Sequence, residues 1–152
     1  MYACQERPHD QAPLEPSREH AEALAESWWE GFARQDAASL TALFAERATF
    51  WDPRFAPFAG RRNIGLYYDD LLANTHTWGG RRSSLYLGEA GRLALHTRSS
   101  FVFRATGKLI DFPMVAFFTQ HAGEITSYEE YWDTGYVLRQ LGIPAFPARL
   151  PF

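Results

Sequence analysis

Residues 28–53 read WWEGFARQDAASLTALFAERATFWDP, a stretch in which helical spacing of apolar residues gives way to strand-like alternation. Asp36 is placed to cap a short helix. The inner face of that helix carries three apolar residues, Leu40, Leu43 and Phe44. Residues 47–52 then alternate as in a strand that stops before a proline. Phe50 and Asp52 share one face of this predicted strand.

Two further helices flank this stretch. Upstream, Ser17 can cap a helix over about 17–34. Its inner face carries five apolar residues at helical spacing, Ala21, Leu24, Ala25, Trp28 and Phe32. Downstream, residues 53–62 contain two prolines and a glycine and are expected to form a loop. A third helix is predicted over about 63–74, where apolar residues recur at i, i+3, i+4, i+7 and i+8.

The second half of the chain alternates between strand-like segments and turns that contain glycine. Strands are predicted over residues 85–89, 93–104, 109–120 and 125–132, joined as an antiparallel meander. A last helix is predicted over about 134–141. Helices followed by antiparallel strands indicate an α+β domain, which we expect to span residues 17–142. Residues 1–16 are expected to form a loosely ordered arm, and the proline-rich residues 143–152 a tail that lies on the surface.

The composition argues against several classes of protein. Fifteen Lys and Arg residues stand against 18 Asp and Glu residues, so no basic surface for nucleic acid is indicated. The single cysteine leaves no internal disulfide, and the five histidines lack the spacing of a metal site. No apolar run is long enough to span a membrane. Residues 1–16 lack the apolar segment of a secretory signal, so a cytoplasmic protein is expected.

Aromatic residues make up 16% of the chain. They can form the walls of a concave site for an apolar ligand, or fill a well-packed core. The predicted strand 109–120 is apolar on both faces, with Val115 and Phe117 on the side opposite Phe112 and Met114. A sheet that is apolar on both faces needs a second cover, which predicts a homodimer through its outer face. No phosphate-binding loop is present, so no nucleotide cofactor is implied.

Three segments carry a family resemblance. They are residues 28–53, FAGRRNI at 58–64, and GEITSYEEYWD at 123–133 followed by LRQLG at 138–142. Together they resemble the SnoaL-like branch of the nuclear-transport-factor-2-like superfamily. The resemblance implies a strongly curved sheet that helices wrap into a cone with an internal pocket. Enzymes of the superfamily include ketosteroid isomerase, polyketide cyclases, limonene epoxide hydrolase and dehydratases, and many members have no known activity.

Asp52 is the first candidate for catalysis. Apolar rings beside a carboxylate disfavour its charged form, which would raise the pKa of Asp52 and make it a better base near neutral pH. In the resemblance to ketosteroid isomerase, Asp52 aligns with the catalytic base. That enzyme's oxyanion-hole tyrosine and protonated aspartate, however, fall on Trp28 and Ala116 here. The alternative for Asp52 is a structural turn before Pro53.

Glu130 is the second candidate. In the strand 125–132 it shares a face with Tyr128 and Trp132, where a carboxylate is costly unless it is paired. In the resemblance to limonene epoxide hydrolase, Glu130 matches an active-site aspartate. The alternative is an ion pair at the rim of the fold.

Arg98 and His96 are further candidates. The same hydrolase resemblance, over residues 87–100, aligns Arg98 with a catalytic arginine, although the partner acid is replaced by Ser100. His96 lies on the same face of the strand and could transfer protons. Simple alternation would place this polar face in water. The resemblance places it in the pocket, and that is the placement we expect.

These residues together predict an acid/base enzyme without a cofactor or metal. It would isomerise, cyclise, dehydrate or open an epoxide in a small apolar substrate, of polyketide or terpenoid type. Asp52 would act as the base, and Glu130 or the His96 and Arg98 pair would complete the proton path. Contact with the substrate is expected from Trp28, Phe50, Tyr67, Phe112, Met114, Tyr128 and Trp132. The alternative is a ligand-binding or dimerisation module of the same fold without chemistry.

Overall fold

The structure is a computed structural model that describes residues 17–146. The predicted arm at 1–16 and the end of the tail at 147–152 lie outside the described residues. In chain order the elements are α1 (Arg18–Ala33), α2 (Ala37–Ala42), β1 (Phe44–Trp51), β2 (Phe58–Ala59), α3 (Arg61–Asn74), β3 (Thr75–Leu87), β4 (Arg92–Phe103), β5 (Lys108–His121), β6 (Glu124–Trp132) and α4 (Thr134–Leu141).

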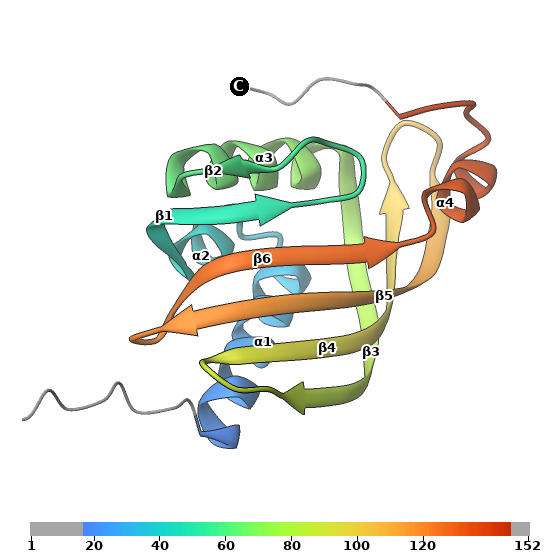
Figure 1. Cartoon of the computed structure of the whole chain (residues 1–152). Helices are drawn as coiled ribbons and strands as arrows, with labels where there is room; N and C mark the ends of the chain where they lie inside the picture. The colour runs from blue at the N-terminus through green and yellow to red at the C-terminus, as the bar shows by residue number, and fades with distance from the viewer. Residues whose placement is uncertain (1–16, 147–152) are drawn as a thin grey trace, which may run out of the picture.

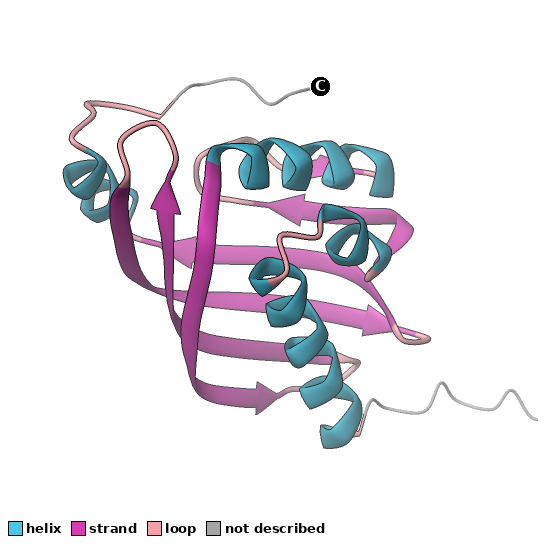
Figure 2. Cartoon of the chain, turned by 180° about the vertical axis from the view of Figure 1, so that it is seen from behind, coloured by secondary structure: helices cyan, strands magenta, loops and turns pink. Residues whose placement is uncertain are grey.

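One curved sheet organises these elements. Its strand order is β2-β1-β6-β5-β4-β3. Strands β3 to β6 form the predicted antiparallel meander, whereas β1 pairs with β6 in parallel. The strands curve together, as Figure 1 shows. Seen from behind in Figure 2, α1, α2 and α3 lie across one face of the sheet. The predicted α+β fold with a curved sheet is therefore confirmed, with one parallel pair in an otherwise antiparallel sheet.

Local sequence signals set most of the helix ends. The side chains of Ser17 and Asp36 accept the backbone N–H groups of His20 and Ser39, as N-caps do. Gly142 ends α4 with a φ of 75°, a conformation that glycine adopts without strain. Helix α4 has the predicted bounds.

Two strands begin three or more residues before their predicted first residue. Strand β1 begins at Phe44, because the carbonyl of Leu43 already accepts the N–H of Ile125, the second residue of β6. Strand β3 begins at Thr75, ten residues before the predicted strand. Its first half lacks clear apolar alternation and contains two glycines. One of them, Gly80, lies against the indole of Trp29 so closely that a Cβ atom would overlap the ring. Strand β2 lies within the predicted loop.

The core fills the space between the helices and the inner face of the sheet. Alternate residues of β4, β5 and β6 point inward, as the burial of Leu95, Phe118 and Tyr128 shows. The indole of Trp28 packs edge-on against Phe118, with 5.8 Å between ring centroids. Helix α1 thus lies directly on the strands that carry the candidate residues.

Gly31 provides a test of how closely α1 packs on α2. A Cβ atom added at Gly31 would lie 2.6 Å from Cγ of Leu40. We expect Gly31→Ala to lower the free energy of unfolding by about 1–3 kcal/mol through overpacking, although alanine is the better helix former. Urea unfolding followed by circular dichroism measures this. In a Leu40→Ala background the same change should cost much less, and strictly additive effects would contradict the contact.

Candidate functional site

A cavity lies between the inner face of the sheet and helices α1, α3 and α4. All seven residues predicted to contact a substrate line it: Trp28, Phe50, Tyr67, Phe112, Met114, Tyr128 and Trp132. Its volume is about 50 Å³, room for a few water molecules, since about 10–15 Å³ on this measure holds one. Aromatic side chains therefore fill most of the interior, and polar groups are few.

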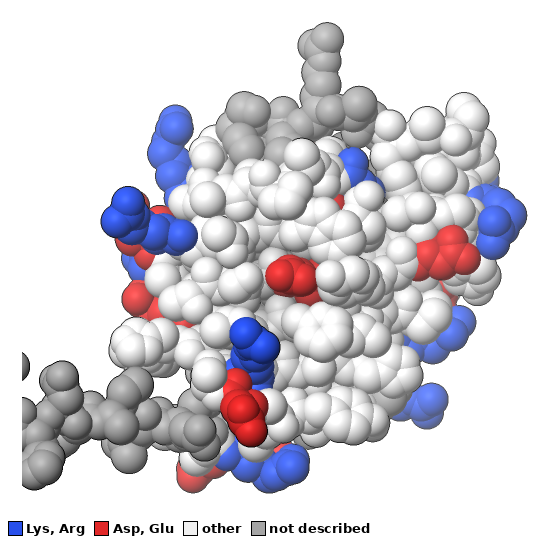
Figure 3. Space-filling view, in the orientation of Figure 1, with Lys and Arg blue, Asp and Glu red and all other residues white. Residues whose placement is uncertain are grey.

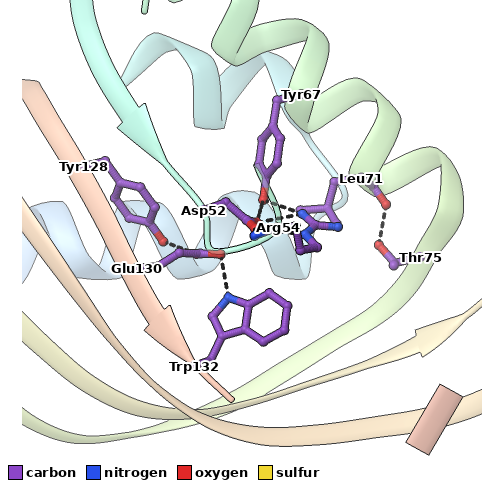
Figure 4. Close-up of polar contacts among 8 residues, drawn as sticks. All are labelled: Asp52, Arg54, Tyr67, Leu71, Thr75, Tyr128, Glu130 and Trp132. Carbon is purple, nitrogen blue, oxygen red and sulfur yellow. Dashed lines mark hydrogen bonds and ion pairs between the residues drawn. The ribbon is translucent and has the colours of Figure 1, made fainter. Parts of the chain in front are cut away.

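Asp52 and Glu130 reach this cavity together because of the parallel pairing of β1 with β6. In that pairing Trp51 is the partner of Glu129, so the residues that follow them, Asp52 and Glu130, are also neighbours. Both side chains line the cavity and both residues are buried. Figure 4 shows them side by side, with Arg54 and Tyr67 beyond Asp52 and with Tyr128 and Trp132 around Glu130.

Asp52 is fully paired. Nε and Nη2 of Arg54 lie 2.9 and 2.7 Å from its two carboxylate oxygens, and the backbone N–H of Arg54 donates to Oδ1 at 2.8 Å. The hydroxyl of Tyr67 donates to Oδ2 at 2.7 Å. The bond from a backbone N–H two residues on is the turn geometry considered for Asp52 before Pro53. Asp52 therefore makes a structural turn and also faces the cavity.

Arg54 determines the charge of Asp52. Burial alone would raise the pKa of this carboxyl, but the positive charge and hydrogen bonds of Arg54 outweigh it and lower the pKa below its ordinary value. The prediction that neighbouring rings raise the pKa of Asp52 is therefore wrong. A carboxylate that is held ionised in this way is a weak base at neutral pH.

Glu130 has the opposite environment. Its Oε2 accepts the hydroxyl of Tyr128 at 2.6 Å, and its Oε1 accepts the indole N–H of Trp132 at 2.9 Å. Within residues 17–146, no ion pair joins it to an arginine, lysine or histidine. Burial, followed by repulsion from Asp52 and a hydrogen bond that protonated Glu130 donates to Asp52, raises the pKa of Glu130 to about 8.

The two carboxyl groups therefore hold one proton between them near neutral pH. Asp52 is ionised and Glu130 is protonated. Environments that separate the pKa values of two neighbouring acids are typical of acid/base sites. Because the two groups interact, they titrate as a pair.

His96 and Arg98 do not join this pair. Both are exposed on the outer face of β4, while the alternate residues Thr97 and Ser99 are buried. Arg98 forms an ion pair with Asp111 of the neighbouring strand β5. The prediction that His96 and Arg98 face the pocket is therefore wrong, and simple alternation gives the correct face. An arginine on the outer face keeps its hydration, whereas in the apolar cavity it would lose it.

Eight residues that line the cavity lie outside the predicted site residues, and Arg54, Trp78 and Phe146 are three of them. The sequence does contain a signal for Arg54: it is a basic residue two positions after Asp52, the acid that ends the predicted strand 47–52. Trp78 packs on the rings of Phe32 and Phe101, although it lies in the part of β3 that lacks alternation. Phe146 belongs to the predicted surface tail, yet its ring packs edge-on against Trp132 at a centroid distance of 5.7 Å and lines the cavity.

The described part of the chain contains neither a cluster of side chains that could hold a metal ion nor a helix that could span a membrane. No group of three or more His, Cys, Asp or Glu side chains within residues 17–146 is placed to hold a metal ion. Likewise, none of the helices between these residues is long and apolar enough to cross a membrane.

The pKa of Glu130 predicts how stability depends on pH. Between its ordinary value of 4.5 and the folded value of about 8, the unfolded chain has released a proton that the folded protein keeps. Stability should therefore fall as pH rises through this range, by up to about 1.4 kcal/mol per pH unit. The lowered pKa of Asp52 has the opposite sign, and its effect is confined to pH values below about 4.

Urea unfolding at pH 5, 6.5 and 8 measures this slope. We expect Glu130→Gln to flatten it, because glutamine has no proton to release. Glu129→Gln is the matched control, since Glu129 is exposed on the opposite face of the same strand. An equal slope in the wild-type protein and in Glu130→Gln would show that Glu130 is not the buried acid described above.

Comparison with known proteins agrees with this fold. The solved structure of a hypothetical protein with a ketosteroid isomerase-like fold from Catenulispora acidiphila, in complex with trimethylamine, matches with a TM-score of 0.73 and 21% identity. The match covers 82% of this chain and 97% of that chain. An LEH-like epoxide hydrolase from M. tuberculosis matches with a TM-score of 0.69 and 13% identity, over 81% of this chain and 90% of that chain.

A computationally designed 17-OHP binder has a TM-score of 0.67 and 17% identity, over 77% of this chain and 95% of that chain. At these identities the structures show a shared fold. No curated protein matches by sequence. The family model described as a SnoaL-like domain matches residues 25–128, well over half of the chain. The chain therefore belongs to the SnoaL-like family, as its sequence predicts.

Proposed function

We propose that this protein is an acid/base enzyme in which Glu130 carries the proton and no cofactor is required. The observation that carries the proposal is the pair of buried carboxyl groups in one apolar cavity, of which only Asp52 has a cationic partner. Glu130 keeps its proton near neutral pH and offers it to a substrate oxygen.

The proton path needs only Glu130. Transfer of its proton to a carbonyl, hydroxyl or epoxide oxygen leaves a carboxylate that Tyr128 and Trp132 hold in place by hydrogen bonds. This carboxylate has a pKa near 8, so it is a competent base and can take a proton from carbon or from water. Asp52 and Arg54 are positioning residues: the charge of Asp52 adds to the effect of burial in raising the pKa of Glu130, and Arg54 keeps Asp52 charged.

The walls of the cavity suit a small apolar substrate of polyketide or terpenoid type. Most of its lining is aromatic or aliphatic, including the seven residues predicted from the sequence. The volume of about 50 Å³ is smaller than such a molecule, so binding requires wall side chains such as Trp78 and Phe146 to move aside. Among the solved structures that share this fold, one is an LEH-like epoxide hydrolase and another is a designed 17-OHP binder, which supports a small-molecule substrate for this chain.

A ligand-binding module without chemistry is the second candidate. The complete pairing of Asp52 with Arg54 and Tyr67 favours it, because a network with all its hydrogen bonds made is also what a purely structural role requires. The two candidates differ in whether Glu130 exchanges its proton with the bound molecule.

The experiment offers the protein small cyclic epoxides, β,γ-unsaturated ketones and linear polyketones, with products detected by chromatography and mass spectrometry. We expect turnover of at least one class, and Glu130→Gln should lower kcat by about 10²–10⁴-fold, the usual contribution of a positioned acid or base. Glu129→Gln should keep full activity. Compounds that quench the tryptophan fluorescence of the cavity without being converted would favour the binding module.

The pH profile of kcat gives an independent check. If proton donation by Glu130 limits the rate, kcat should be level below about pH 8 and fall above it, because ionised Glu130 has no proton to give. A profile that rises through the same range would contradict the assignment of Glu130 as the acid of the rate-limiting step.

A further inference from the structure

An irregularity in strand β3 turns Trp78 into the cavity. The register of β3 with β4 shifts by one residue between His76 and Gly79. Two residues of β3, Thr77 and Trp78, therefore stand opposite a single residue of β4, which is a β-bulge. Thr75 is buried, and simple alternation would place Trp78, three positions further on, on the opposite face of the sheet. Because of the bulge, Trp78 points inward instead and lines the cavity.

The bulge holds Thr77 in an unfavourable backbone conformation. Its φ is 52°, in the left-handed region where a bulge commonly has glycine. A residue branched at Cβ is rarely found there, and the conformation stores strain. Strained backbone of this kind is concentrated at ligand sites and at parts that move. The arrangement with Trp78 inside the cavity therefore carries a conformational cost that a rearranged bulge would release.

The indole of Trp78 fills a slot with apolar walls and one polar end. The rings of Phe32 and Phe101 pack against it at centroid distances of 4.6 and 4.7 Å. Its Nε1–H donates to Oγ1 of Thr75 at 2.8 Å. The hydroxyl of Thr75 donates its own proton to the carbonyl of Leu71 at 2.6 Å, as Figure 4 shows. Toward the slot, this hydroxyl is therefore only an acceptor.

The sheet closes the cavity on its other side. The strands are hydrogen-bonded to one another throughout the sheet. Figure 3 shows the side chains over the middle of β1, β6 and β5 as a continuous and mostly uncharged layer. Trp78, in contrast, is half-buried, so part of its side chain reaches solvent while the rest lines the cavity. A side chain in this position can move outward without crossing the core.

We propose that Trp78 is a displaceable wall of the cavity, and that the slot it fills is a subsite for a flat ring with an O–H or N–H donor. The indole already has the properties of such a ligand, because it is flat and donates to Thr75. Outward movement of Trp78 would expose this acceptor and the rings of Phe32 and Phe101. It would also enlarge the cavity beyond its present volume of about 50 Å³. Release of strain at Thr77 would offset part of the contact that the indole loses.

Trp78 is in this account a specificity-determining residue, since it selects ligands by shape and by the presence of a donor. The inference rests on the proposed function only in taking this cavity as the ligand site. It applies equally to an enzyme and to a binding module without chemistry.

Isothermal titration calorimetry with 2-naphthol and 2-methoxynaphthalene tests the polar end of the subsite. Both compounds have the same flat pair of rings, but only 2-naphthol carries a donor. We expect the wild-type protein to bind 2-naphthol more tightly by about 2–10-fold, the usual effect of one hydrogen bond. Thr75→Val removes the acceptor and keeps the shape of the side chain, so it should abolish this preference.

Two further variants test displacement, and they should have opposite effects. Trp78→Ala leaves the slot open, so both compounds should bind about tenfold more tightly or better, because a closed form that dominates the population weakens binding by at least this factor. Thr77→Gly removes the strain from the closed form, so both compounds should bind about fivefold more weakly or worse. Circular dichroism checks that every variant folds.

Trp29→Ala is the matched control. Trp29 is also half-buried and contacts the same strand at Gly80, but it is not among the residues that line the cavity. It should bind both compounds as the wild-type protein does.

The results separate this inference from the proposed function. Binding with these preferences, without turnover of any compound, would support the subsite while the acid/base function fails. Turnover by a protein whose affinity for both compounds is unchanged in Trp78→Ala and Thr77→Gly would overturn the subsite and leave the function standing. A preference for 2-naphthol that survives Thr75→Val would overturn the subsite, as would the absence of binding to both the wild-type protein and Trp78→Ala.

Discussion

The ion pair between Arg54 and Asp52 is the interaction on which the candidate site depends. It places a negative charge in a cavity walled by aromatic rings, and Tyr67 together with the backbone N–H of Arg54 completes the hydrogen bonds of that charge. A second negative charge beside it is disfavoured first by burial and then by repulsion from Asp52, and Glu130 has no ion-pair partner of its own among the described residues. Glu130 therefore keeps a proton at a pH where glutamic acid is normally ionised.

The fold brings these groups together from distant parts of the chain. Asp52 and Arg54 follow β1, Tyr67 comes from α3, and Glu130 comes from β6. The parallel pairing of β1 with β6 sets the register that makes Asp52 and Glu130 neighbours. The same alternation along β6 places Glu130 inside, at the cavity, and Glu129 outside.

The sequence predicts what depends on local spacing. The caps at Ser17 and Asp36, the bounds of α4 and the meander of β3 to β6 follow from patterns within a few residues. The inward residues of β5 and β6, including Glu130, also follow from alternation. The pairing of β1 with β6 does not, because two strands separated by more than seventy residues leave no local signal of their register or direction.

The two wrong predictions concern the pKa of Asp52 and the face of β4 on which His96 and Arg98 lie, and both have physical causes. The apolar neighbours of Asp52 predict a raised pKa. The cation that lowers this pKa instead is Arg54, which lies in a loop without periodicity. For Arg98, the family resemblance and the alternation along β4 predict opposite faces of the sheet. Alternation was correct because the outer face lets Arg98 pair with Asp111 without losing contact with water.

The most direct test of the account is the pKa of Glu130, measured by NMR titration of its side-chain carboxyl carbon in the wild-type protein and in Asp52→Asn. The account predicts a pKa of about 8 in the wild-type protein. It predicts a clearly lower value in Asp52→Asn, because repulsion from Asp52 is removed while burial continues to hold the pKa of Glu130 above its ordinary range. A Glu130 that titrates near 4.5 in the wild-type protein would contradict the claim that it is the protonated buried acid. A Glu130 that titrates at the same pH in both proteins would contradict the claim that the charge of Asp52 adds to the effect of burial.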